Sequence, residues 1–200
     1  MEKKHLVLAS GSPRRKELLS QLGYEFSVLV TDVEECKHTQ ETAEEYVKRL
    51  SLDKALAALS LLTTNPSEKQ HVASGSDTVV LGSDTVVVSQ GQVLEKPADF
   101  SDSKRMLTQL ANGRHQVMTA VSVVSKEKQK TEIVITDVWF KPLSEKEIEQ
   151  YWQTGEPCDK AGSYGIQGLG GRFVTRIEGS YYAVVGLPLF ETDQLLQEFL

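Results

Sequence analysis

The chain has 200 residues, of which 40% are hydrophobic and 25% are charged, and its formal net charge at pH 7 is -6. Such a size and composition are those of a soluble globular protein, organised as one domain or as two lobes that share a cleft. The negative net charge argues against a nucleic-acid polymer or an anionic membrane as the main partner. We find no pattern of a signal peptide or a membrane span, and Cys36 and Cys158 lack zinc-type spacing. We therefore expect free thiols in a reducing compartment and a cytoplasmic protein.

The first predicted elements are a strand at 5–9 and a helix that begins after Ser12 at the N-cap and stops at Gly23. Its first turn carries three cations, Arg-Arg-Lys at 14–16, although the helix dipole disfavours positive charge at that end. A solvated basic patch is one explanation of this cluster. We favour the other, a bound phosphate, because the Ser-Gly-Ser-Pro loop at 10–13 follows an apolar strand and would direct N–H groups and guanidinium groups at an anion.

A strand is expected at 24–30, and Glu34-Glu35 after it is either a solvated acidic turn or a pair of functional carboxylates. A capping box, Thr42-Ala-Glu-Glu, then opens a helix to about Leu62. The apolar stripe of this helix is expected at Val47, Leu50, Ala57 or Ala58, and Leu61. Lys54 lies on the same stripe, where a lysine must either extend its ammonium to solvent or bind an anion.

A short duplication, Ser-Asp-Thr-Val-Val at 76–80 and again seven residues later at 83–87, leaves two candidate aspartates. Asp84 follows a plausible buried strand at 79–81, whereas Asp77 follows a poor one, so we choose Asp84 as the carboxylate of an active site. The alternative is an aspartate that only caps a turn. A second strand is expected at 85–88, and residues 91–96 complete a hairpin that ends near Lys96, which is unremarkable when taken alone.

The later elements alternate between helices and strands. We expect a helix at 101–110, strands at 115–125 and 132–140, a capped helix at 144–154, a glycine-rich loop at 155–171, a β-hairpin at 173–185 that turns near Glu178-Gly179, and a final helix from about 191 to 200. The glycine-rich loop is either a linker or a close approach to a ligand, and Gln167 within it could read the edge of a pyrimidine base. The whole pattern predicts an α/β fold with a mixed, twisted sheet flanked by helices.

Taken together, the candidates form two groups with complementary chemistry. Four cations suit a polyphosphate, and two carboxylates could hold Mg²⁺ or activate water, as a phosphoanhydride hydrolase requires. The cations are Arg14, Arg15, Lys54 and Lys96, and the carboxylates are Glu35 and Asp84.

Six segments, in this order, resemble the Maf (septum-formation inhibitor) family. They are Leu-Ala-Ser-Gly-Ser-Pro-Arg-Arg at 8–15, Glu-Glu at 34–35, Leu-Gly-Ser-Asp-Thr at 81–85, Leu-Glu-Lys-Pro at 94–97, Gln-Val-Met-Thr-Ala at 116–120, and Asp-Lys-Ala-Gly-Ser-Tyr-Gly-Ile-Gln-Gly at 159–168. The resemblance covers about residues 6–196 and implies a single Maf-like domain, with two lobes around a nucleotide cleft as in inosine-triphosphatase-like folds. It also implies a homodimer and a house-cleaning nucleoside triphosphate pyrophosphatase that uses a divalent cation, Mg²⁺, Mn²⁺ or Co²⁺.

Within the family the chain is similar to the dTTP/UTP pyrophosphatase branch. It has Arg14 where the 7-methyl-GTP branch has Trp, Thr85 where that branch has Gln, and Gln167 in a segment that contains Glu there. The stretch 63–82 is longer than the family pattern because of the duplication. The twelve-residue step from Asp84 to Lys96 fits that pattern, whereas Asp77 would need seven more residues.

The resemblance implies one role for each site residue. Asp84 would accept a proton and, with Glu35, hold the metal; Arg14, Thr85 and Gln167 would set base specificity; Ser10, Arg15, Lys54 and Lys96 would bind phosphate. Water would attack the α-phosphorus of dTTP, UTP or a modified pyrimidine triphosphate and release pyrophosphate. Two alternatives stay open: a pyrophosphatase for a modified purine triphosphate, and a nucleotide-binding regulator of septum formation that needs no turnover.

Overall fold

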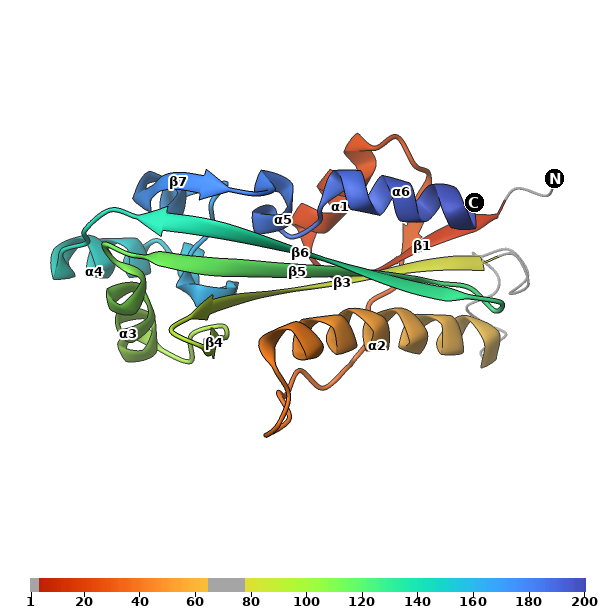
Figure 1. Cartoon of the computed structure of the whole chain (residues 1–200), viewed down its shortest axis with the longest axis horizontal. Helices are drawn as coiled ribbons and strands as arrows, with labels where there is room; N and C mark the ends of the chain where they lie inside the picture. Colours follow the sequence, from red (N-terminus) through yellow and green to blue (C-terminus); the bar gives the residue numbers. More distant parts are fainter. Residues whose placement is uncertain (1–3, 65–77) are drawn as a thin grey trace. The chain divides into compact units, whose positions relative to one another are not determined.

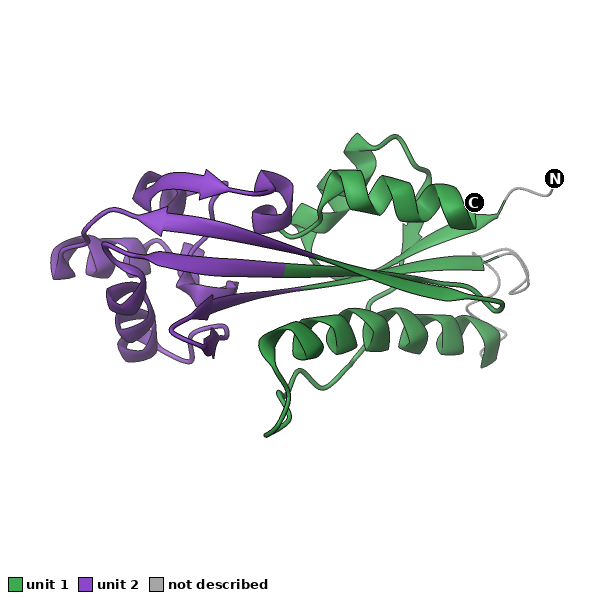
Figure 2. Cartoon of the chain, viewed as in Figure 1, with its two compact units in different colours: residues 1–84, 119–133, 186–200 green, residues 85–118, 134–185 purple. Residues whose placement is uncertain are grey.

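The computed structural model describes residues 4–64 and 78–200, which form two compact units (Figure 2). Unit 1 comprises residues 1–84, 119–133 and 186–200, and unit 2 comprises residues 85–118 and 134–185. Within the described ranges the strands form one mixed sheet in the order β2-β1-β3-β5-β6-β7, with β4 paired to β3. The predicted α/β class with a mixed sheet is confirmed, while the single domain and the nucleotide cleft stay predictions.

The strands and helices follow the predicted order along the chain (Figure 1). The strands are β1 His5–Ala9, β2 Phe26–Val28, β3 Thr78–Ser89, β4 Gln92–Leu94, β5 Arg114–Val124, β6 Gln129–Phe140 and β7 Val174–Glu178. The helices are α1 Pro13–Gln21, α2 Ala43–Thr64, α3 Phe100–Leu110, α4 Glu145–Gln153, α5 Tyr181–Val185 and α6 Leu189–Phe199, with short 3₁₀ turns η2 Glu156–Asp159, η3 Ala161–Ser163 and η4 Leu169–Phe173. In the described part of the chain, no helix has the length and hydrophobicity needed to span a membrane.

Unit 1 is built on three parallel strands. Strand β1 pairs with β2 through Leu6↔Phe26 and with β3 through Leu6↔Val79, so the hydrophobic run at 5–9 is the centre of this part of the sheet. Figure 1 shows α2 on one side of these strands and α1 and α6 on the other. The expected capping box of α2 is present, because the Glu45 amide donates to Thr42 Oγ1 and the Thr42 amide donates to Glu45 Oε2. The helix therefore starts where the sequence predicts.

One cluster of the core of unit 1 lies between α2 and the strands. Buried and partly buried apolar side chains of α2 meet those of β1, β3 and β5 there: Val7, Ala9, Leu29, Leu52, Ala55, Ala58, Leu59, Leu62, Val80 and Val124. Of the predicted stripe, Val47, Leu50 and Ala58 are buried, but Leu62 is buried in place of Leu61. Leu62 follows Ala58 by four residues and so lies on the same helix face, and the helix ends at Thr64, two residues beyond the predicted end.

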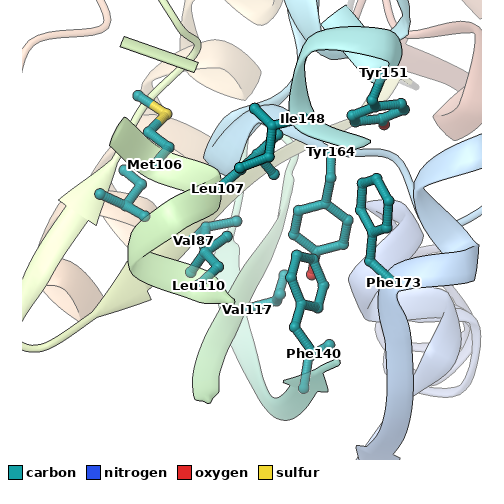
Figure 3. Packing of buried hydrophobic residues seen from close by; sticks show 12 residues of the cluster. Val87, Met106, Leu107, Leu110, Val117, Phe140, Ile148, Tyr151, Tyr164 and Phe173 are labelled. Carbon is teal, nitrogen blue, oxygen red and sulfur yellow. The ribbon is translucent and has the colours of Figure 1, made fainter. Parts of the chain in front are cut away.

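Unit 2 has a core rich in aromatic rings (Figure 3). Phe140 and Tyr164 meet edge to face with ring centroids 4.7 Å apart, and Tyr151 and Phe173 do so at 4.9 Å. Buried His115 shares a hydrogen bond of 2.8 Å between Nε2 and the Tyr164 hydroxyl. These contacts tie α4 and the segment after it to β5 and β6.

Two strand predictions were wrong in detail. The predicted strands at 79–81 and 85–88 are one continuous strand, β3, because Gly82 and Ser83 keep extended backbone and continue the ladder. The predicted strand at 24–30 pairs only over Phe26–Val28. The hairpin after β3 is confirmed: Gln90 (φ 52°) and Gly91 (φ 76°) form its two-residue turn, and both have the positive φ that such turns require.

The predicted hairpin at 173–185 was also wrong in its second half. Residues 174–178 form β7, antiparallel to β6, but residues 181–185 form helix α5. Ser180 is the reason, because its Oγ accepts the Ala183 amide and its carbonyl accepts the Val184 amide, which is the pattern of an N-cap. Gly179 (φ 128°) makes the change of direction between the two elements. The capped helix at 144 is confirmed as α4, and the final helix begins at Leu189 rather than 191.

Candidate active site

Lys54 is the centre of a charged cluster in unit 1. Its ammonium donates a hydrogen bond of 2.7 Å to Asp84 Oδ1 and makes an ion pair of 2.7 Å with Glu35 Oε1. The side chains of Lys54 and Asp84 are only 13% and 10% exposed, whereas that of Glu35 is 40% exposed. Of the two explanations offered for a lysine on the apolar stripe, binding to an anion is therefore the one observed. Two carboxylates are held within reach of one cation.

The position of Asp84 is set by the close packing of β3 against α2. Gly82 precedes it by two residues, and since side chains alternate along a strand, the two positions face the same side. A Cβ at Gly82 would lie 2.3 Å from the carbonyl oxygen of Ser51 and 2.9 Å from the amide of Ala55. Glycine is thus required where the strand touches the helix backbone, and this contact brings Asp84 within reach of Lys54. Asp77 lies outside the described residues.

Arg15 lies on α1 and is anchored to the backbone of the C-terminal segment. Its Nε donates to the Gly186 carbonyl at 2.8 Å, and the Ser83 hydroxyl donates to the same oxygen at 3.2 Å. Burial lowers the pKa of Arg15, and the charge of Arg14 adds to this effect, while Asp84 and Glu35 act in the opposite direction. Since arginine stays protonated in proteins, Arg15 places a fixed positive charge within electrostatic reach of both carboxylates.

The first turn of α1 differs from the prediction in one respect. Ser12 occupies the N-cap and Pro13 the first helical position, as expected, but the Ser12 side chain makes no capping hydrogen bond. Its amide instead donates to Ser10 Oγ at 3.2 Å. Ser10, in the loop that joins β1 to α1, is buried, and Arg14, in the first turn of α1, is half-buried.

A residue that sequence reasoning missed holds the segment carrying Glu35. Arg49 on α2 binds Glu41 with two hydrogen bonds, of 2.6 Å from Nε and 3.0 Å from a terminal nitrogen. The same guanidinium donates at 2.9 Å to the carbonyl of Cys36, the residue after Glu35. This pairing lowers the pKa of Glu41 to about 2. Arg49 precedes Lys54 by five residues, which correspond to about 140° around a helix, so Arg49 does not share the face of Lys54, and the sequence carries no signal for its role.

Three predicted site residues belong to unit 2. Thr85 is half-buried in β3, Lys96 is exposed just after β4, and Gln167 is exposed between η3 and η4. Their roles in specificity and phosphate binding stay predictions. The glycine-rich segment around Gln167 is not a plain linker, because it folds closely over Tyr151 and Glu156, two further residues that sequence reasoning missed.

The cluster in unit 1 has the components of an acid–base and anion site. Asp84 is a carboxylate oriented by a hydrogen bond, so it can accept a proton from a correctly placed water. Lys54 and Arg15 can stabilise anionic oxygens. Among the described residues there is no group of three or more His, Cys, Asp or Glu that could hold a metal ion. The pair Glu35 and Asp84 could contribute two oxygen ligands, which is the share that proteins commonly supply to Mg²⁺ when a phosphate substrate supplies others.

A family model and curated relatives match nearly the whole chain. A family model described as Maf-like protein matches residues 5–199. A dTTP/UTP pyrophosphatase of Vibrio parahaemolyticus is 69% identical over 195 residues, covering 98% of this chain and 97% of that protein. One from Photobacterium profundum is 60% identical over 196 residues, covering 98% and 96%. The solved structure of the Staphylococcus aureus Ham1 protein covers 68% of this chain and 72% of that chain, at 17% identity and a TM-score of 0.46.

Proposed function

The chain belongs to the Maf family, and from this premise we propose that it is a nucleoside triphosphate pyrophosphatase that acts on dTTP and UTP. Relatives that carry the name dTTP/UTP pyrophosphatase are 60–69% identical to it over almost the full length of both chains, which supports the proposal. The observation that carries it is the ammonium of Lys54 between the carboxylates of Asp84 and Glu35, within electrostatic reach of Arg15. Products would be the nucleoside monophosphate and pyrophosphate, in a house-cleaning role.

In the proposed reaction, Asp84 is the proton acceptor. Lys54 binds Oδ1, so the proton of the attacking water goes to Oδ2 as the water adds to the α-phosphorus. The bond from the α-phosphorus to the bridging oxygen breaks, and pyrophosphate leaves with the electron pair. Arg15, with Arg14, Lys54 and Lys96, stabilises the charge that develops on the phosphate oxygens. Ser10 binds phosphate, and Arg14, Thr85 and Gln167 distinguish the base.

We also propose a divalent cation, Mg²⁺, Mn²⁺ or Co²⁺, as the cofactor. The donors fit such an ion, because Glu35 and Asp84 offer hard carboxylate oxygens that both lie 2.7 Å from the same ammonium nitrogen. These oxygens are therefore no farther apart than twice that distance. When bound, the cation neutralises charge on the triphosphate. Glu35, the more exposed of the two carboxylates, is the one that can turn to meet it.

A panel of triphosphates tests the proposal. Purified protein would be assayed for release of pyrophosphate and of monophosphate from dTTP, UTP, dCTP, dATP, dGTP, ITP and 7-methyl-GTP, with each of the three metals and with EDTA. We expect dTTP and UTP to be the best substrates and EDTA to abolish turnover. Preference for ITP or another purine nucleotide would replace the pyrimidine assignment. If dTTP bound tightly but no monophosphate formed with any of the three metals, the alternative of a nucleotide-binding regulator without turnover would be favoured.

The same proposal includes an oligomeric state and a cellular location. The resemblance to the family leads us to propose a homodimer, which light scattering of the eluting protein at several concentrations would test. A mass of 22.2 kDa throughout would contradict it. A cytoplasmic location is supported by the exposed free thiols of Cys36 and Cys158, which a reducing compartment would preserve.

A further inference from the structure

Tyr151 and Glu156 form a bonded pair in unit 2 that the proposed chemistry does not use. Tyr151 lies on α4 and is fully buried, and its hydroxyl donates a hydrogen bond of 2.7 Å to Glu156 Oε1. Glu156 is the first residue of η2, three residues after the end of α4. The pair therefore lies at the base of the glycine-rich segment, with Tyr151 on the helix that the capping box of Ser144 begins and Glu156 in the turn that follows it.

The pair binds the backbone at both ends of one short loop, residues 165–170. At the first end, the Gly165 amide donates to the Tyr151 hydroxyl at 3.0 Å. At the other end, the amides of Leu169 and Gly170 donate to Glu156 Oε2 and Oε1 at 2.8 and 3.0 Å. Gln167 lies midway between these ends and is exposed. The loop is thus closed on the pair, with Gln167 at its tip.

The glycines of the loop are explained by the same pair. A Cβ at Gly168 would lie 2.3 Å from Glu156 Oε2, and one at Gly170 would lie 2.6 Å from the Tyr151 hydroxyl oxygen. The backbone can approach these polar groups closely only because no side chain intervenes. Glycine at these positions therefore lets the backbone pack against polar side chains of the same protein. The sequence predicted either a linker or a close approach to a ligand, and neither alternative included this contact.

The charge of Glu156 strengthens the closure. Burial acts to raise the pKa of its carboxyl, but the amides of Gly170 and Leu169 and the hydroxyl of Tyr151 outweigh burial and hold this pKa below the ordinary value. Hydrogen bonds to an ionised acceptor are stronger than those to a neutral one. In Glu156→Gln, the side-chain NH₂ group would face a backbone N–H group, from which it cannot accept a hydrogen bond. The end of the loop at Leu169 and Gly170 would then be released.

We propose that Glu156, with Tyr151, is a specificity-positioning residue, which fixes the loop 165–170 so that Gln167 is presented to the pyrimidine base of the substrate. This inference rests on the proposed function, because it assigns Gln167 to the base. It adds a residue that acts on base choice without touching the substrate, and it separates base recognition from the phosphate chemistry of unit 1. Changes to the pair should therefore alter which nucleotide is accepted more than how fast a bound nucleotide reacts.

The test compares Glu156→Gln with the wild type and with Glu149→Gln. Glu149 is an exposed glutamate on α4, so its replacement removes the same charge without touching the loop. We expect Glu156→Gln to lower the preference for UTP over dATP and dGTP, measured as a ratio of kcat/KM, about tenfold, mainly through KM. Amide hydrogen exchange at Leu169 and Gly170 should accelerate about tenfold in the protein without nucleotide. Glu149→Gln should match the wild type in both measurements.

Two further variants separate positioning from general support of the fold. Tyr151→Phe keeps the ring against Phe173 but removes the hydroxyl, so it should reduce the preference by less than Glu156→Gln does. Adding Glu156→Gln to Gln167→Ala should cause little further loss of preference, because both changes disable the same contact. A Glu156→Gln enzyme that keeps its preference, or loses kcat equally for every nucleotide, would overturn the inference. A wild type without pyrimidine preference would instead refute the proposed function, and this inference with it.

Discussion

Replacement of Asp84 by asparagine isolates the proton-accepting role that we assign to it. Asparagine has the same shape, and its Oδ1 can still accept the hydrogen bond that Lys54 donates at 2.7 Å. Lys54 also keeps its ion pair with Glu35, so the ammonium does not become an unpaired buried charge. The perturbation therefore removes a negative charge and a base while leaving the packing of β3 against α2 in place.

The expected magnitudes are very different for stability and for turnover. A charge-assisted hydrogen bond contributes about 1.5–3 kcal/mol, and part of this is retained by asparagine, so the loss should be about 1 kcal/mol of the unfolding free energy. Loss of a positioned base lowers the rate by about 10²–10⁴. Urea unfolding and pyrophosphate release from UTP, measured on the same preparation, would show this contrast.

Asp77→Asn is the matched control, since it makes the same change in the other copy of Ser-Asp-Thr-Val-Val. We expect it to retain wild-type turnover. If Asp84→Asn retained wild-type turnover while Asp77→Asn lost it, the choice between the two copies would be wrong. If both variants stayed active, neither aspartate would be the base, and the reasoning from the contact between Lys54 and Asp84 would be refuted.

Three further predictions concern residues around the site and in the core. Arg49→Gln should free the segment carrying Glu35 and lower kcat roughly tenfold in steady-state assays. The control Arg105→Gln breaks only an exposed ion pair with Asp102 and should leave kcat unchanged. Gly82→Ala should destabilise unit 1 by about 1–3 kcal/mol in urea unfolding, because the new Cβ would lie 2.3 Å from a backbone oxygen of α2. Gly113→Ala is the control, since its Cβ would make only ordinary van der Waals contacts and should not destabilise the protein in this way. Burial lowers the pKa of His115 to about 4, so the unfolded chain, with an ordinary pKa near 6.5, binds more protons between these values. Stability should therefore fall as the pH decreases from 7 to 5, by about 2 kcal/mol, and His115→Gln should remove this component.

Local signals predicted the elements well where the responsible groups are close together in the sequence. The capping boxes at Thr42 and Ser144 each join residues three apart, and both helices begin as predicted. The hairpin after β3 also follows the prediction, although Gly91, expected in its second strand, lies in the turn with Gln90. These boundaries depend on short-range hydrogen bonds, so a single sequence contains the information needed to place them.

The errors arose where a local pattern allowed two outcomes. The β-branched and aromatic residues at 181–185 favour a strand, but Ser180 caps a helix, and the cap prevails because Gly179 has already turned the chain away from β6. The strand-like runs at 79–81 and 85–88 are separated by Gly82, Ser83 and Asp84, so the sequence predicts two strands. Gly82 lies inside one strand, where it contacts the backbone of α2. A contact with a helix that is distant in the sequence does not alter the hydrophobic pattern of the strand, so the sequence does not reveal it.

The candidate site shows the same division between local and distant information. Lys54 could be singled out because a charged residue interrupts an apolar stripe, and its anions were then found in the structure. Arg49 and Glu156 could not, because an arginine and a glutamate at those positions are ordinary surface residues until their partners are known. Arg49 acts through Glu41 and the Cys36 carbonyl, and Glu156 through amides thirteen and fourteen residues away.

The formal charges of the unit 1 cluster explain why we expect the reaction to depend on a divalent cation. Glu35 and Asp84 contribute two negative charges, and Lys54 and Arg15 contribute two positive charges, so the four groups are neutral as a set. A neutral set cannot by itself compensate a triphosphate, and approach of the anion would oppose the two carboxylates. Arg14 and Lys96, which we also assign to the substrate, add two positive charges, so part of the substrate charge stays uncompensated. A divalent cation held by Glu35 and Asp84 would add two positive charges and reverse this balance, so the carboxylates that disfavour the bare nucleotide would favour its metal complex.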